Sequence, residues 1–189
     1  MNKSKFVALA ISLAAAAPAL ADNDGLYFGG FIGKSESKES ACRIPDMACD
    51  RKATSFSGNL GFMFTPNWGV EAAYHDLGNV FEQDNRMGTS ASAKVRAGSL
   101  VLVAALPVQS FSLYGKFGGY RAKTDLTSTV LTEDSSKNNQ WTYGAGIRWD
   151  VFKHFALRAE WQRFQSVGGG AVGFRSDIDT LSGGELITF

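Results

Sequence analysis

The chain has no stretch of 18 consecutive apolar residues, and its charges nearly cancel. A membrane-spanning helix needs about 20 predominantly apolar residues, so the sequence predicts no such helix. Lysine and arginine together number 19 and aspartate and glutamate 18 among 189 residues. A nucleic-acid-binding domain carries a marked excess of basic residues, so this balance argues against a nucleic-acid partner.

Histidine and cysteine are scarce, which leaves little for metal or catalytic chemistry. Cys42 and Cys49 lie in a polar segment, and His75 and His154 are the two histidines. A structural zinc site takes four such ligands, and no histidine lies near the cysteines, so we expect no metal site and no cofactor. In an exported protein, two cysteines at this separation suggest a local disulfide.

Residues 1–21 have the pattern of a secretory signal peptide. Two lysines near the start precede a short apolar run, and small residues then mark a cleavage position between Ala21 and Asp22. Removal of this segment leaves residues 22–189 as the mature domain, with a charge of 17 − 18 = −1 because both of those lysines are lost. The pattern predicts export from the cytoplasm.

Eight segments of the mature chain alternate large apolar with polar or small residues, the period-2 pattern of β-strands. The expected strands are 25–37, 54–64, 68–77, 91–106, 111–124, 140–151, 155–165 and 177–189. Most contain about ten residues or more, whereas a strand of a soluble protein has about five or six. A tilted strand needs about 9–11 residues to cross a bilayer, so these lengths favour a transmembrane β-barrel.

The connections between the expected strands alternate in length. Those after the second, fourth and sixth strands are tight turns, whereas those after the first, third, fifth and seventh have roughly 11–16 polar residues, as solvated loops do. Short periplasmic turns and long external loops are the asymmetry of outer-membrane barrels, and an even strand count brings both termini to the periplasm. The sequence therefore predicts an all-β fold, an eight-stranded antiparallel up-and-down transmembrane barrel with four external loops.

The alternative is a secreted soluble sandwich or a lipocalin-like barrel, whose apolar faces would point inward. The apolar faces of this chain carry too many large aromatic rings for a narrow lumen, while the opposite faces carry small residues and isolated charges. Aromatic residues also gather near the strand ends, as interfacial girdles do. These are Phe64, Trp68, Phe111, Trp149, Phe155 and Phe189. We therefore expect the apolar faces to point to lipid.

The last residues of the chain carry a further indication. The spacing Ser182-x-Gly184-x-x-Ile187-x-Phe189 resembles the C-terminal assembly signal of bacterial outer-membrane β-barrels, in which the terminal strand pairs with the first strand and its aromatic residue anchors at the membrane interface. One position departs from that pattern. Glu185 shares the face of Phe189, where such barrels usually have an apolar residue.

The mature chain resembles the OmpA-like outer-membrane β-barrel superfamily of small eight-stranded barrels. The resemblance is carried by the segments 25–30 (GLYFGG), 68–78 (WGVEAAYHDLG), 113–119 (LYGKFGG) and 143–148 (YGAGIR). We expect no peptidoglycan-binding domain, since the chain ends at Phe189. Stand-alone members with this layout are small surface barrels of adhesion, membrane integrity or host interaction. The resemblance thus implies residence in the outer membrane of a Gram-negative cell. The implied partners are its lipid and lipopolysaccharide, the barrel assembly machinery, and a host or surface ligand at the loops.

Strand alternation predicts a set of charges that point into the lumen: Glu71, Lys94, Arg96, Lys116, Arg148, Arg158 and Glu160. In the strand 91–106 this assignment sets Lys94 and Arg96 opposite an apolar face that contains Val95, Ala97, Val101, Val103 and Ala105. Unpaired buried charges are costly, so we expect a salt-bridged network. The resemblance implies that Glu71, Lys116 and Arg158 form such a plug. Eight strands leave room for side chains only, which favours a closed interior over a gate that passes ions.

No catalytic set stands out, and we expect that the protein is not an enzyme. Some eight-stranded barrels modify lipid A with serine, histidine and acidic residues near the outer leaflet, and His75 followed by Asp76 is the candidate here. Neighbours in a strand point to opposite faces, so a serine and another carboxylate would have to lie near His75. Three hypotheses stay open: a structural or surface-interaction protein that acts through its loops, a small ion-conducting pore and, as the least favoured, a lipid A-modifying enzyme.

Overall fold

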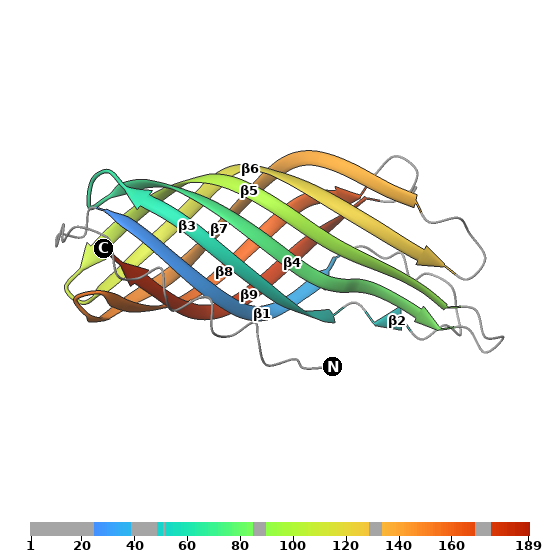
Figure 1. The fold of residues 1–189 in the computed structure, drawn as a ribbon, viewed down its shortest axis with the longest axis horizontal. Coiled ribbons are helices and arrows are strands. Elements are labelled where there is room, and N and C mark those ends of the chain that lie inside the picture. The colour runs from blue at the N-terminus through green and yellow to red at the C-terminus, as the bar shows by residue number, and fades with distance from the viewer. Residues whose placement is uncertain (1–24, 39–48, 51, 85–89, 129–133, 169–174) are drawn as a thin grey trace, which may run out of the picture.

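The computed structural model describes residues 25–38, 49–50, 52–84, 90–128, 134–168 and 175–189. These residues form one antiparallel sheet whose strands follow the order β2-β4-β3-β1-β9-β8-β7-β6-β5 (Figure 1). The strands are β1 (Leu26–Ser37), β2 (Cys49–Asp50), β3 (Lys52–Met63), β4 (Trp68–Asp84), β5 (Ser90–Val108), β6 (Phe111–Ser128), β7 (Asp134–Phe152), β8 (Phe155–Gly168) and β9 (Arg175–Thr188). No helix among the described residues is long and apolar enough to cross a membrane.

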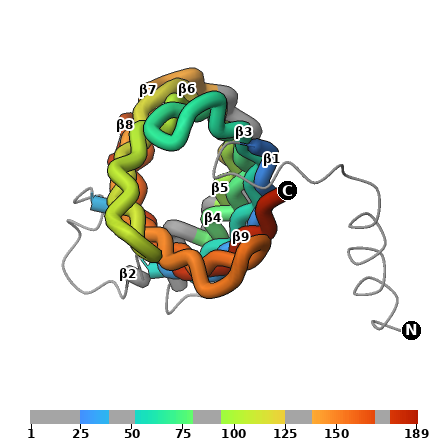
Figure 2. Tube along the Cα trace, turned by 90° about the vertical axis from the view of Figure 1, so that its left-hand side faces the viewer, coloured from blue at the N-terminus to red at the C-terminus, as the bar shows by residue number. Residues whose placement is uncertain are grey.

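Eight of these strands make the wall of a closed barrel. A further pairing, between β4 and β5, joins the two long edges of the sheet, and the wall forms a ring in Figure 2. Among the described residues, the two-residue strand β2 pairs with β4, opposite Glu82 and Gln83, so it continues the sheet at the loop end, beyond the first residue of β3. The predicted eight-stranded antiparallel barrel is confirmed, whereas β2 was not expected from the sequence.

The two ends of the barrel differ. At one end, which we call the turn end, only a few residues connect β3 to β4, β5 to β6 and β7 to β8, and the chain terminates beside them at Phe189 (Figure 1). The first of these turns is held by Thr65, whose Oγ1 accepts hydrogen bonds from the backbone N–H groups of Asn67 and Trp68 at 3.3 and 3.0 Å. We call the opposite end, where β4 and β6 end, the loop end.

The strands extend farther toward the loop end than the sequence predicted. β4 continues to Asp84 instead of 77, and β7 begins at Asp134 instead of 140. The strand bounds leave only 85–89, 129–133 and 169–174 as the later connections at this end, which is shorter than the predicted 11–16 residues. The reason is that backbone pairing does not require apolar side chains, so polar segments beyond the bilayer can continue the ladder.

Large apolar side chains are exposed all around the outer wall. Exposed members include Ile32, Phe56, Leu60, Tyr74, Leu100, Leu102, Phe117, Trp141, Ile147, Leu157 and Leu181. Stacked aromatic pairs lie at both margins, Phe111 on Trp149 near the turn end and Phe117 on Trp141 farther along the wall, with ring centroids 5.9 and 5.5 Å apart. On β7 the span from Trp141 to Trp149 matches the roughly 9–11 residues that a tilted strand needs to cross a bilayer.

The first and last strands of the wall, β1 and β9, pair with each other. The backbone N–H of Phe189 donates to the carbonyl oxygen of Leu26 at 3.0 Å, and its ring stacks on Phe28 with centroids 5.7 Å apart. Glu185 lies on the exposed outer face, between Gly30 of β1 and Leu157 of β8. Because Leu157 is paired in turn with Trp149, this carboxylate sits at the level of the aromatic margin near the turn end.

Replacement of Glu185 by valine should stabilise the barrel by about 1 kcal/mol, because a charged group on the lipid face is unfavourable even near the membrane interface. The free energy of unfolding in vesicles, measured by urea titration, checks this. Glu36→Val is the matched control, since Glu36 is also exposed on the outer face but lies at the loop end of β1, and it should bring no gain. Destabilisation by Glu185→Val would contradict the register of β9.

Candidate functional site

Four charged side chains from three strands meet inside the barrel. Glu71 comes from β4, Lys116 from β6, and Arg158 and Glu160 from β8, and all four are buried. Lys116 Nζ lies 2.5 Å from Glu71 and 2.7 Å from Glu160, while the guanidinium of Arg158 lies 2.7 Å from Glu71 and 2.8 Å from Glu160. Each cation therefore contacts both carboxylates and each carboxylate both cations. We call this closed, electrically neutral ring the lumenal charge network.

Two tyrosines complete the hydrogen bonding of the carboxylates. The hydroxyl of Tyr27 donates to Glu71 Oε2 and that of Tyr114 to Glu160 Oε2, both at 2.8 Å. Tyr114 also accepts a bond of 2.6 Å from Arg158 Nε, and the guanidinium lies 4.1 Å from the centre of its ring. The cost of removing ions from water is offset only when such additional hydrogen bonds occupy the remaining lone pairs, and these tyrosines supply them.

Both tyrosines depend on a glycine in the neighbouring strand. Tyr27 pairs with Gly61 and Tyr114 with Gly146, and a Cβ atom on either glycine would collide with the tyrosine side chain. The absence of that atom lets each ring lie flat across the neighbouring strand, so that its hydroxyl reaches a glutamate one strand farther on. The same tyrosine–glycine–glutamate relation thus occurs twice, on β1, β3 and β4 and on β6, β7 and β8.

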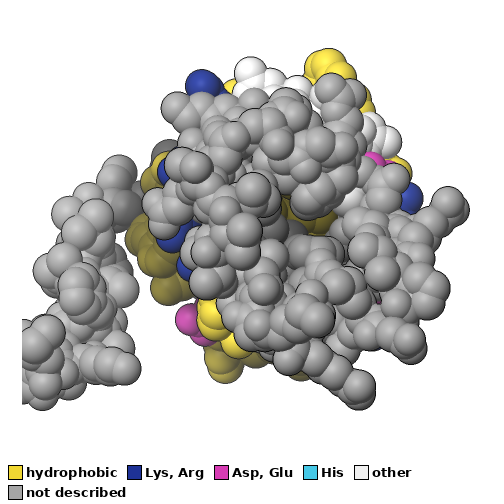
Figure 3. Space-filling view, turned by 90° about the vertical axis from the view of Figure 1, so that its right-hand side faces the viewer, with side chains coloured by type: hydrophobic (Ala, Val, Ile, Leu, Met, Phe, Trp, Pro, Cys, Tyr) yellow, Lys and Arg dark blue, Asp and Glu magenta, His cyan; other side chains and the backbone are white. Residues whose placement is uncertain are grey.

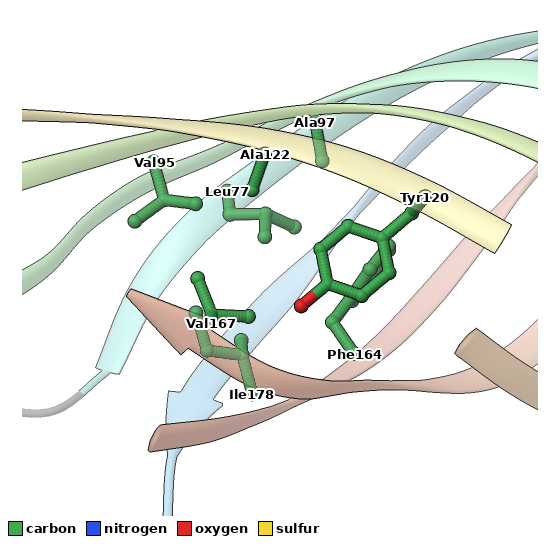
Figure 4. Close-up of a cluster of buried hydrophobic side chains, with 8 residues drawn as sticks. All are labelled: Leu77, Val95, Ala97, Tyr120, Ala122, Phe164, Val167 and Ile178. Atoms are coloured by element: carbon green, nitrogen blue, oxygen red, sulfur yellow. The ribbon is translucent and has the colours of Figure 1, made fainter. Parts of the chain in front are cut away.

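Apolar clusters lie on both sides of the lumenal charge network along the barrel axis. The loop-end cluster is formed by Leu77, Val95, Ala97, Tyr120, Ala122, Phe164, Val167 and Ile178 (Figure 4). The turn-end cluster is formed by Tyr27, Phe31, Met63, Val101, Val103, Tyr114, Ala156 and Leu186. A cavity of about 40 Å³ next to Arg158 and Arg148 has room for only a few water molecules. The charges therefore sit between two layers of packed apolar side chains.

The structure brings together four of the seven charges predicted for the lumen, and the predicted inward orientation of Lys94 and Arg96 is wrong. Lys94 and Arg96 lie on the outer face of β5, where Arg96 is exposed and Lys94 pairs with Asp76 at 3.1 Å. The valines predicted to face lipid are instead buried inside, and Leu100 and Leu102 are exposed. β5 is apolar on both faces near its middle, so the sequence does not determine which face points to lipid and which points into the lumen.

Arg148 lies apart from the four central charges. Its guanidinium contacts Asp150 at 2.6 Å, two residues along β7 toward the turn end, and both side chains are half-buried. Arg148 also borders the small cavity near the turn end. This pair therefore forms a separate ion pair near the turn-end mouth of the lumen.

His75, the histidine considered for catalysis, lies beside a serine and an aromatic ring. It is buried inside the barrel, where Nε2 lies 3.0 Å from Ser99 Oγ and the ring packs edge-on against Phe164 with centroids 5.0 Å apart. Asp76 points to the outer face, as expected. No carboxylate forms a hydrogen bond with His75 among the described residues, so a serine is within reach but the acidic partner is missing.

The other predicted site residues fall in different parts of the chain. Cys42 lies outside the described residues, as do residues 1–21 and the Ala21–Asp22 junction, so the disulfide and the signal peptide stay predictions. His154 lies in an exposed turn, with Nδ1 3.1 Å from the carbonyl oxygen of Thr188. Within the described ranges, no three His, Cys, Asp or Glu side chains are arranged to hold a metal ion.

Tyr27 and Tyr114 are the members of the site that sequence reasoning missed as functional residues. Each follows a leucine and precedes a glycine-rich stretch. This repeated pattern is the feature of the sequence that could have identified the two tyrosines. Strand alternation puts Tyr114 on the same face as Lys116, two residues along, but nothing in the sequence alone reveals which carboxylate a tyrosine will reach across the neighbouring strand. The glycines on the intervening strands determine that contact.

A family model described as outer membrane protein beta-barrel domain matches residues 6–179 of the chain. The chain belongs to this family. It is therefore a small outer-membrane β-barrel of the OmpA-like class, and the resemblance found in the sequence is confirmed. The apolar outer wall agrees with this environment, since the family places those side chains in contact with membrane lipid.

Solved outer-membrane barrels share the fold. The structure of Ail, the attachment invasion locus protein of Yersinia pestis, in complex with the heparin analogue sucrose octasulfate has a TM-score of 0.58 and 16% identity, covering 88% of this chain and 99% of that chain. Neisserial surface protein A has a TM-score of 0.64 and 12% identity, covering 87% and 97%. OprG of Pseudomonas aeruginosa has a TM-score of 0.55 and 16% identity, covering 88% and 96%. A comparison with curated proteins found no match.

The variant Glu71→Gln should destabilise the barrel by about 3 kcal/mol, because it leaves Lys116 and Arg158 with a single carboxylate between them. Adding Lys116→Met restores charge balance in the lumen. The double variant should therefore be more stable than Glu71→Gln alone, although each single change removes native contacts. Urea titration of the four proteins of this cycle in vesicles measures the coupling. Purely additive free energies would show that the four charges do not act as one network.

Proposed function

We propose that the protein is a non-enzymatic outer-membrane barrel whose lumen is closed and whose function lies at its outer surface, as a structural protein that contacts a host or surface ligand. The observation that carries this proposal is the position of the lumenal charge network between two apolar clusters. Apolar side chains pack on both sides of the charges, and the cavity of about 40 Å³ beside Arg148 and Arg158 is small, so an ion entering from either end would meet apolar packing. The parts left for interaction are the loop end and the outer wall.

The proposed orientation has the loop end outside the cell and both termini in the periplasm. Short turns on the periplasmic side support it, because outer-membrane barrels have this asymmetry. Export would proceed through the signal peptide 1–21 with cleavage between Ala21 and Asp22. Ser182, Gly184, Ile187 and Phe189 would serve as the signal read by the barrel assembly machinery. The stacking of Phe189 on Phe28 supports that role, since this contact forms only when the first and last strands pair.

The proposed interaction surface includes the connection between β1 and β3, where we expect a disulfide between Cys42 and Cys49. The β2 strand, which begins at Cys49, pairs with β4 beyond the first residue of β3 and so supports an extended structure on this side of the loop end. Among the similar structures, Ail is named as an attachment invasion locus protein and was solved with a heparin analogue. By analogy, we propose a sulfated glycan as the first ligand class to test.

The surroundings of His75 support the absence of catalysis. A lipid A-modifying site would need its base near the outer leaflet and open to lipid, whereas His75 is 6% exposed and faces the barrel interior. Phe164 covers it on the loop-end side. A substrate could not reach Ser99 or His75 without displacing the loop-end cluster.

A small ion-conducting pore is the second candidate function. The observation that favours it is the shared coordination of Lys116, which contacts Glu71 and Glu160 at similar distances of 2.5 and 2.7 Å. A cation with two equivalent partners can shift between them without becoming unpaired, and such a shift would be the first step of gating. The apolar clusters would also have to move before ions could pass.

In a planar bilayer, the refolded mature protein should give no discrete conductance steps, and Glu71→Gln should be equally silent because the apolar clusters remain. A heat-dependent shift in mobility on SDS gels verifies in each case that the barrel is folded. Discrete channels whose conductance changes in Glu71→Gln would reject the closed lumen in favour of the pore.

Removal of residues 42–49 should lower the adhesion of expressing cells to a heparin-coated surface, relative to an uncoated one, while the barrel remains folded. The reason is that the change removes an external connection and spares the eight wall strands. Dye uptake by the same cells measures envelope integrity. If neither adhesion nor integrity changes, this connection has no part in the function.

A further inference from the structure

One buried titratable side chain, His75, has no part in the lumenal charge network. It points inward from β4, four residues after Glu71 and two before Leu77. Its Nε2 atom lies 3.0 Å from Ser99 Oγ of β5, and its ring packs edge-on against Phe164. Because Phe164 belongs to the loop-end cluster, the histidine touches both the polar part of the lumen and the side chains that close it.

A proton on His75 would add a positive charge that the lumen does not balance. The charged groups that face it are Lys116 of β6, Glu71 of β4 and Glu160 of β8, and each carboxylate already contacts two cations. The charged side chains visible at the loop end lie at the margin of the wall (Figure 3). Burial of an unpaired charge is costly, so protonation of the imidazole opposes the closed lumen.

An irregular segment of the wall adjoins Phe164. The pairing of β8 with β9 shifts register between Phe164 and Val167, and we call residues 165–168 the β8 bulge. Ser166 in this bulge has a φ of 52°, a left-handed conformation that is strained for a residue with a Cβ atom. Phe164 and Val167 both belong to the loop-end cluster (Figure 4). Part of that cluster is therefore carried by a stretch of strand that regular pairing does not hold.

Side chains from three other strands hold the β8 bulge. Tyr120 of β6 donates its hydroxyl to one carbonyl oxygen of the bulge at 2.5 Å, and Asn138 of β7 donates its amide to two more at 2.6 and 2.8 Å. Asp177 of β9 accepts a bond of 2.9 Å from the backbone N–H of Ser166. Tyr120 also packs edge-on against Phe164, with ring centroids 5.2 Å apart. The bulge and the ring that contacts His75 are thus connected through Tyr120.

We propose that His75 is an acid sensor that regulates the seal at the loop end. At neutral pH the uncharged imidazole bonds to Ser99 and Phe164 packs against it, so the loop-end cluster is closed. In acid the imidazolium requires hydration, and release of Phe164 together with the β8 bulge lets water reach it. The polar side chains Gln162 and Thr142 then become accessible from the loop end, while the turn-end cluster stays packed.

The sensor rests on the closed lumen of the proposed function, because it describes when that seal is released. The two ideas fail separately. Entry of a reagent into the lumen at neutral pH would contradict the closed lumen. A seal that holds equally at neutral and at acidic pH would contradict the sensor and leave the closed lumen intact.

The test measures how fast a thiol inside the loop-end cluster reacts. Val95→Cys, in a protein with Cys42→Ser and Cys49→Ser, places one thiol where the valine is 2% exposed. The refolded mature protein in micelles is treated with a pyridyl disulfide, which reacts with thiols in acid as well as at neutral pH. Each rate is divided by that of the heat-unfolded protein at the same pH. Because opening takes up one proton, the corrected rate should rise about tenfold from about pH 6 to about pH 5.

Three further variants isolate the histidine. His75→Gln keeps an amide that can bond to Ser99 but takes up no proton, so it should abolish the rise. His154→Gln changes the other histidine, which lies in an exposed turn, and should leave the rise as it is. Val103→Cys, in place of Val95→Cys, puts the thiol in the turn-end cluster on the same strand and should stay unlabelled throughout. The mobility shift on SDS gels confirms folding of each variant, and His75→Asn replaces His75→Gln if the latter does not fold.

A rise that persists in His75→Gln would assign the acid response to a carboxylate such as Asp177 and would overturn the sensor. Absence of any rise in the parent protein would overturn it as well. Equal labelling of Val95→Cys and Val103→Cys in acid would mean that the whole barrel loosens, and this result would also reject a sensor confined to the loop end.

Discussion

Charges removed from water must be neutralised by one another, and the interior of this barrel depends on that constraint. Glu71 is 1% exposed and accepts bonds from Lys116, Arg158 and Tyr27. Loss of either cation leaves buried negative charge in excess, and loss of Tyr27 leaves a buried acceptor without its donor. The network also joins β4, β6 and β8, which are not neighbours in the wall. These contacts across the lumen complement the backbone pairing around the circumference and fix how the opposite sides of the barrel face each other.

The same constraint gives the two faces of the wall different side chains. Outside, lipid accepts large apolar side chains, and the aromatic pairs Phe111–Trp149 and Phe117–Trp141 mark the two margins of that region. Inside, the charge network lies between two apolar clusters, and further buried polar side chains such as Gln162 and Thr142 lie among them. If the lumen is closed, as we propose, the surfaces left for partners are the loop end and the outer wall.

Much of the barrel could be predicted because β-strand alternation has a fixed period, and long strands with short turns have few folding alternatives. The four central charges followed from that period. On β5 the alternation did not distinguish the two faces, because Val101 and Val103 inside and Leu100 and Leu102 outside are all apolar. Arg96 was therefore assigned to the wrong face. The length of the strands beyond the bilayer was also missed, since backbone pairing there leaves no apolar pattern.

The most direct test of the sealed interior is the accessibility of a thiol introduced at Gln162, which is 2% exposed and bonded to Thr142 between the charges and the loop-end cluster. In a protein with Cys42→Ser and Cys49→Ser, Gln162→Cys would be treated with a small charged thiol reagent in the folded state. A sealed lumen predicts no labelling until the barrel is unfolded by heat. Rapid labelling of the folded protein would show that water and ions reach the charge network, and would contradict the account.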